Sequence, residues 1–157
     1  MTLEKQPISS PHNRHEGQQA IVIGTGPSLN KTRGLWMLEG ETTFLVSRAK
    51  LWLWYPALFT PTYHVLSDAN HVREAQSWRI EVNRERFLVA DWAVDADGWT
   101  TIPKAQELYL SDHGMAGLGG EFQPFRNGRS SVLSAVQLAA WMGATAIYLV
   151  GCDTNLQ

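Results

Sequence analysis

The segment from Ile21 to Asn30 constrains the fold more than any other part of the chain. It starts with three apolar residues that favour a buried strand, and it then changes abruptly to the sequence GTGPS at positions 24 to 28. This change predicts a strand, a tight turn and the start of a helix. Glycine allows positive φ angles and a close backbone approach by a ligand, and Pro27 suits the first helical position because its missing N–H is not needed there.

The turn at positions 24 to 28 also predicts an anion site. The amides that begin a helix have no partner within it, and they lie at the positive end of the helix dipole. The phosphate of a nucleotide is the natural ligand of such a turn. The same pattern occurs as a purely structural link between a strand and a helix, so both interpretations stay open.

The rest of the chain alternates between apolar strands and helical segments. The predicted strands cover 20–23, 42–46, 62–66, 86–90, 107–110 and 146–150, and the predicted helices cover 28–39, 72–80 and 130–142. Near-continuous apolar strands that alternate with helices indicate an α/β fold of three layers, with a mostly parallel central sheet covered on both faces. The glycine-rich segment 111–128 reads as a long loop, and its role is left open.

Composition excludes several classes of function. The 157 residues carry a net charge of −2, which predicts no binding to nucleic acid, and no apolar run reaches the 18 residues of a membrane span. Residues 1–19 lack the apolar core of a signal peptide, and we expect a flexible lead-in there, followed by one domain over 20–157. The single cysteine, Cys152, excludes an intrachain disulfide and a multi-cysteine zinc site. We expect a cytoplasmic protein.

Small or acidic residues follow the predicted strands at positions 24, 47, 68, 91 and 153. In open α/β sheets the ligand crevice lies outside the carboxyl ends of the strands. Asp68 and Asp153 can hold a divalent metal ion or ribose hydroxyls, or they can cap nearby elements. Ser130 and Ser131 begin the apolar helix and can form a second anion-facing terminus, with ordinary capping as the alternative.

Other residues carry weaker indications. Ser47-Arg48 stands about 20 residues after the glycine turn, where a basic residue suits NADP, but Leu29 replaces the third glycine of that fingerprint. We interpret His64, inside a strand, as a packed histidine rather than a base. We interpret Cys152 as a small buried side chain.

Several motifs carry a resemblance to a known family. They are GTGPSL (24–29), TTFLVSRAK (42–50), FTPTYHVLSDAN (59–70) and NGRSSVLSAVQLAAWMGATAIYLVGCD (127–153). In this order they resemble the 6-hydroxymethylpterin pyrophosphokinase-like family, which includes motility-accessory and flagellin-glycosylation proteins. They are also similar to bacterial family 42 sialyltransferases. The resemblance covers about residues 20–155.

The resemblance implies a Rossmann-like fold and a nucleotide-binding transferase, most simply a glycosyltransferase that uses a nucleotide-activated sugar for a surface polysaccharide or glycoprotein. In the sialyltransferases the glycine turn and the serine-led helix hold a cytidine-monophosphate (CMP) donor, whereas the pterin enzymes bind ATP and Mg²⁺. A pyrophosphokinase-like transfer from ATP and a non-catalytic nucleotide-binding module are the alternatives. The expected nucleotide site comprises Gly24, Thr25, Gly26, Pro27, Ser28, Ser47, Asp68, Ser130, Ser131 and Asp153, with Asp68 and Asp153 as the candidate Mg²⁺ ligands.

Two features depart from the family. Ser47 stands where the relatives usually carry asparagine, and the chain ends at Gln157, before the position of the sialyltransferases' catalytic histidine. We therefore expect a domain that is incomplete at its C-terminus, and we assign no catalytic residue. The crossover topology of a parallel sheet predicts that the helix from Ser130 begins at the same sheet edge as the turn at 24–28.

Overall fold

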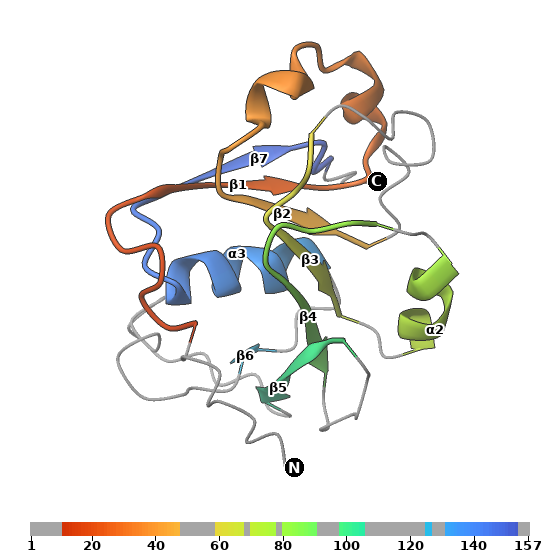
Figure 1. Cartoon of the computed structure of the whole chain (residues 1–157), viewed down its shortest axis with the longest axis vertical. Helices are drawn as coiled ribbons and strands as arrows, with labels where there is room; N and C mark the ends of the chain where they lie inside the picture. Colours follow the sequence, from red (N-terminus) through yellow and green to blue (C-terminus); the bar gives the residue numbers. More distant parts are fainter. Residues whose placement is uncertain are drawn as a thin grey trace, which may run out of the picture.

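A computed structural model describes residues 11–47, 59–67, 70–77, 80–90, 98–105, 125–126 and 131–153. Strands and helices alternate along this part of the chain, and Figure 1 shows their arrangement. In chain order they are β1 (Gln19–Ile23), η1 (Pro27–Lys31), η2 (Leu35–Leu38), β2 (Thr43–Val46), β3 (Tyr63–Leu66), α2 (Asn70–Ser77), β4 (Glu85–Ala90), β5 (Thr100–Ala105), β6 (Phe125–Arg126), α3 (Ser131–Trp141) and β7 (Ala146–Val150). The fold is α/β, as predicted, and η1 and η2 are 3-10 helices.

The strands form a sheet in the order β6-β5-β4-β3-β2-β1-β7, and every neighbouring pair is parallel. The chain runs outward from β1 to β6 on one side and then returns through α3 to place β7 on the other side of β1. The register aligns Val22 with Phe44, and Phe44 with Tyr63. Because all strands point the same way, the segments that follow them meet at one edge of the sheet.

One face of the sheet is covered by α3. Side chains from β1 to β4 pack there against the helix, among them Val22, Phe44 and Tyr63. The rings of Phe44 and Tyr63 stack with centroids 4.8 Å apart. Ala135 and Leu138 are fully buried on the sheet side of α3. The apolar surface predicted for this helix therefore supplies a large part of the core, and burying a large apolar side chain such as Leu138 contributes about 1.5–3 kcal/mol.

The other face packs against shorter elements. Ile23 and Leu45 bury Leu29 of η1 and Leu35 of η2, and farther along the sheet Leu66 and Leu88 pack against α2. The side chains of successive strand residues alternate between this core and the one under α3, as the pleat of a strand requires. Both faces are therefore covered, as the apolar strands predicted.

The single helix predicted over 28–39 is wrong, because the structure has the two 3-10 helices η1 and η2 instead. Leu29 and Leu35 are both buried, but residues six apart lie about 120° apart round an α-helix, so one straight helix would not point both at the same core. Gly34, with φ +76°, adopts the left-handed conformation before η2. The chain therefore changes direction between the two buried leucines.

The strand predictions hold for β1, β2, β3, β4 and β7 to within a residue or so. Strand β5 was missed, because Pro103 argues against a strand and its sequence lacks an apolar run. The predicted strand at 107–110 lies outside the described residues. Strand β7 is not buried on both faces as expected: Tyr148 and Leu149 are 52% and 56% exposed because β7 ends the sheet.

Residues 11–18, part of the segment 1–19 that we expect to be a flexible lead-in, are hydrogen-bonded to the body of the protein. The amides of Asn13 and His15 donate to the carbonyls of Trp141 and Met142 at the end of α3. These carbonyls have no acceptor role within the helix, so the segment satisfies them. None of the helices in the described part of the chain is both long and apolar enough to cross a membrane.

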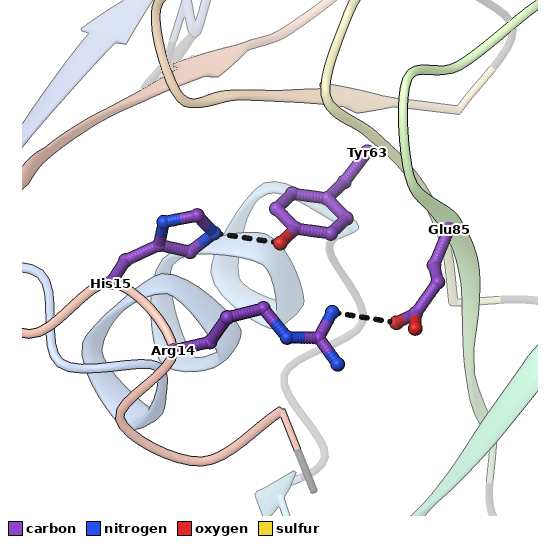
Figure 2. A network of polar contacts seen from close by, with 4 residues as sticks. All are labelled: Arg14, His15, Tyr63 and Glu85. Atoms are coloured by element: carbon purple, nitrogen blue, oxygen red, sulfur yellow. Dashed lines mark hydrogen bonds and ion pairs between the residues drawn. The ribbon is translucent and has the colours of Figure 1, made fainter. Parts of the chain in front are cut away.

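A buried polar network joins this segment to the sheet, as Figure 2 shows. Nε2 of His15 lies 2.6 Å from the hydroxyl of Tyr63, and Nδ1 lies 2.8 Å from Oε1 of Gln18. Oε1 of Gln18 can only accept, so Nδ1 of His15 carries the ring proton and donates it to Gln18. Nε2 of the neutral ring then accepts a hydrogen bond from the Tyr63 hydroxyl. Beside it, Arg14 forms a 3.0 Å ion pair with Glu85 at the start of β4.

We expect Tyr63→Phe to lower the free energy of unfolding by about 1–3 kcal/mol, because it leaves the buried Nε2 of His15 without a donor. The matched control is Glu85→Gln, which weakens a partly exposed ion pair worth about 1 kcal/mol or less. Urea unfolding followed by tryptophan fluorescence measures both variants. Equal losses for the two would show that the His15–Tyr63 bond does not anchor the segment.

Candidate functional site

The candidate site is the carboxyl edge of the sheet around β1, β2 and β3. We use the name carboxyl-edge site for the residues that the structure places there: Gly24–Ser28 after β1, Ser47 after β2, Ser67 after β3, Ser131 at the start of α3, and Asp153 after β7. Neighbouring strands lie about 4.8 Å apart, so the ends of β1 and β3 are separated by about 10 Å. A single nucleotide can span that distance.

Most backbone amides of the turn at 24–28 donate hydrogen bonds to other parts of the same chain. Pro27 has no N–H, and of the four remaining amides those of Gly24, Gly26 and Ser28 donate to the segment that follows β7. Their acceptors are the Val150 carbonyl at 2.8 Å, the Gly151 carbonyl at 2.8 Å and the Asp153 carboxylate at 2.7 Å. Thr25 has the one amide of the turn for which the described residues supply no acceptor.

Close packing of the chain on itself accounts for both glycines of the turn. A Cβ on Gly24 would overlap the Gly151 carbonyl oxygen, and one on Gly26 would overlap Oδ2 of Asp153. Neither glycine has a positive φ, which corrects the conformational reason for expecting them. A substitution at Gly26 therefore disturbs the contact with Asp153 before any ligand is considered.

Asp153 supplies the anion that the glycine turn predicts. Its carboxylate accepts the amide of Ser28, and hydrogen bonds from the Ser28 side chain and amide, followed by the charge of Lys31, hold the pKa of Asp153 below its ordinary value. The carboxylate is exposed to solvent, and it stays charged at neutral pH. The structure thus brings Ser28, Asp153 and the turn together, with the chain's own carboxylate at the amide.

The first turn of α3 lies at the same edge. The hydroxyls of Ser131 and Ser67 are 2.6 Å apart, and Ser67 directly follows β3. The helix therefore begins beside the carboxyl ends of the strands, as the crossover argument predicted. One turn further along, the hydroxyl of Ser134 is buried, and the described residues supply no hydrogen-bond partner for it. Ser67 was not singled out from the sequence, although its position immediately after a predicted strand is the signal that finds it.

The end of β2 lies between the glycine turn after β1 and the Ser67–Ser131 pair after β3. Ser47 has φ +52°, a left-handed conformation that is uncommon outside glycine and asparagine. Its carbonyl accepts a 3.0 Å hydrogen bond from Nε2 of His64. The His64 ring is 1% exposed and packs against Trp99 at 5.2 Å between centroids. This burial lowers the pKa of His64 to about 4, so His64 is a packed neutral histidine, as we interpreted it.

Part of the predicted site falls on residues that are not described. Asp68, Ser130, Arg48 and Asp91 lie outside the described residues, so their roles stay predictions. Within the part of the chain that the structure describes, no group of three or more His, Cys, Asp or Glu side chains is arranged to hold a metal ion. Cys152 is half-buried, and burial raises the pKa of its thiol.

We compared the chain with protein-family models, with curated proteins and with solved structures, and none of these comparisons found a match. The resemblance to pyrophosphokinase-like proteins and sialyltransferases therefore stays a prediction.

We expect Gly26→Ala to destabilise the protein by about 1–3 kcal/mol, because its Cβ enters the space of Asp153 and lies 2.8 Å from the Gly151 carbonyl. In an Asp153→Ala background the larger of these overlaps is gone, so the same substitution should cost less, with a coupling of about 0.5 kcal/mol or more. Urea unfolding of the four proteins in this cycle measures the coupling. An equal cost of Gly26→Ala in both backgrounds would contradict the packing described.

Acid should reduce stability through His64. Its pKa in the folded protein, about 4, is below the ordinary 6.5, so between these two values the unfolded chain binds a proton that the folded chain does not. The contribution is complete above pH 6.5 and declines as the pH falls towards 4, by on the order of 3 kcal/mol. Urea unfolding at pH 7.5 and 4.5 should show a larger loss for the wild type than for His64→Gln. Parallel losses would mean that His64 is not the titrating group.

Proposed function

We propose that this chain is a Rossmann-like nucleotide-binding domain of a transferase, with a nucleotide-activated sugar as the donor. The observation that carries the proposal is the convergence of Ser47, Ser67 and Ser131 with the turn at 24–28 at one edge of a parallel sheet. Strand β1 lies between β2 and β7, so the direction of the chain across the sheet reverses beside β1. Open α/β sheets bind ligands outside the carboxyl ends of their strands at such a reversal.

The start of α3 is the part of the carboxyl-edge site best suited to a phosphate. The helix has 11 residues, and its first amides carry the positive end of the dipole. The hydroxyls of Ser131 and Ser67 are bonded to each other, so one proton lies between them, and the Ser131 hydroxyl can turn to donate to a phosphate oxygen. A phosphate held there is about 10 Å from the glycine turn, which leaves room for the ribose between them.

The glycine turn has a second role in this proposal. Because Asp153 already occupies the Ser28 amide, the turn as described holds a carboxylate. We place the phosphate of the donor at α3, where no carboxylate of the described residues lies against Ser131, and the rest of the nucleotide towards Thr25 and Ser47. The domain would orient the donor and stabilise the charge on the departing phosphate.

Ser131→Ala should weaken the binding of CMP about tenfold or more, since a hydrogen bond to a charged partner contributes about 1.5–3 kcal/mol. Isothermal titration calorimetry with CMP measures this. Ser77→Ala on α2 is the control, because the Ser77 hydroxyl donates to the Glu74 carbonyl of its own helix, away from the carboxyl-edge site, and the affinity should not change.

The same titrations separate the alternatives. Binding of ATP that requires Mg²⁺, with CMP inactive, would favour a pyrophosphokinase-like domain with Asp153 as a metal ligand. Preferential binding of NADP would favour a dinucleotide site instead. If the wild type binds none of these nucleotides, the proposed function is wrong.

A further inference from the structure

The carboxyl end of β2 adopts an unusual conformation. Ser47 and Asn13 are the two residues other than glycine with a positive φ in the described part of the chain. Asparagine tolerates this region because its side chain can bond the local backbone, whereas serine lacks that advantage. The surrounding structure must therefore hold Ser47 in place.

Strand β3 supplies what holds it. The Ser47 amide donates to the Val65 carbonyl at 3.1 Å, and the Ser47 carbonyl accepts from Nε2 of His64 at 3.0 Å. Adjacent residues of β3 thus bind both polar groups of the Ser47 backbone. A carbonyl can only accept, so Nε2 carries the proton in the neutral ring.

The donor side chain is itself immobilised. His64 is 1% exposed, and its ring packs against Trp99. Burial opposes protonation of the ring, and the charge of Arg86 on the neighbouring strand β4 adds to this effect. The ring therefore remains a fixed, neutral donor throughout the neutral pH range.

Ser47 also occupies the centre of the carboxyl-edge site. Strand β2 lies between β1, which leads to the glycine turn, and β3, which leads to Ser67 and Ser131. The Ser47 side chain is only partly buried, and the described residues supply no hydrogen-bond partner for its hydroxyl. No group of the described residues therefore competes with a ligand for that hydroxyl.

We propose that His64 is a positioning residue, which holds Ser47 in the left-handed conformation so that its hydroxyl stays at the centre of the carboxyl-edge site. The part of this inference that concerns a ligand rests on the proposed function. His64 touches no ligand itself. It acts through the Ser47 carbonyl, and it does so from within the core.

The test compares His64→Leu, which removes the donor, with His64→Gln, whose amide nitrogen can reach the same carbonyl. Calorimetry with CMP should show an affinity about tenfold lower for His64→Leu and close to the wild type for His64→Gln. His15→Leu is the matched control, because it removes an equally buried, hydrogen-bonded histidine at the opposite edge and should lower the melting temperature without changing the affinity. Unchanged affinity in His64→Leu would overturn the proposal. If this variant does not fold, His64→Asn, with a shorter amide side chain, replaces it.

A second measurement needs no ligand. Glycine adopts a positive φ without strain, so in a Ser47→Gly background the hydrogen bond from His64 is no longer needed to hold position 47 in the left-handed conformation. His64→Leu should therefore lower the melting temperature less in this background than in the wild type. Equal losses in both backgrounds would overturn the proposal even where CMP binds. If the wild type binds neither CMP nor ATP, the proposed function fails. A smaller loss of melting temperature in the Ser47→Gly background would still establish that His64 holds Ser47 in place.

Discussion

The burial of α3 against β1, β2 and β3 supports both edges of the sheet. Ala135, Leu138 and Ala139 are fully buried there, so the helix cannot shift without opening the core. At its C-terminal end the carbonyls of Trp141 and Met142 receive the segment that carries Asn13 and His15. At its N-terminal end Ser131 reaches the hydroxyl of Ser67 after β3. A single packed helix thus fixes the N-terminal segment at one edge and a polar helix terminus at the other.

The glycine turn shows how one sequence pattern can serve two purposes. Glycines after a buried strand allow a close approach, and here the approaching group is the chain itself. The carbonyl of Gly151 and the carboxylate of Asp153 occupy the space above Gly24 and Gly26. The Asp153 carboxylate is held by the hydrogen bond from Ser28 and by its close contact with Gly26, and it remains exposed to solvent. The same contact therefore stabilises the unliganded turn and marks a position where a negatively charged group is accepted.

The polar groups of the carboxyl edge are held from within the core. His64 is an internal residue of β3, and it determines the backbone of Ser47 on the neighbouring strand. Such support matters for a binding site because groups that are already in place lose little freedom when a ligand binds. Rigid strands carry the residues, and the left-handed Ser47 and the short helix η1 are the places where the chain departs from regular structure.

The sequence by itself determined the α/β class, the positions of five strands and the apolar helix, because each depends on local periodicity and on nearby glycine and serine residues. It also placed Gly24, Ser47 and Asp153 beyond the ends of strands and Ser131 at the start of the helix. Tertiary structure alone decided the rest. The split of 28–39 into two helices follows from two leucines that face one core, and the exposure of Tyr148 follows from the place of β7 at the end of the sheet. The bonds of Asp153 to Ser28 and of His64 to Ser47 join residues far apart in the chain or on separate strands, and no local pattern can encode such pairings.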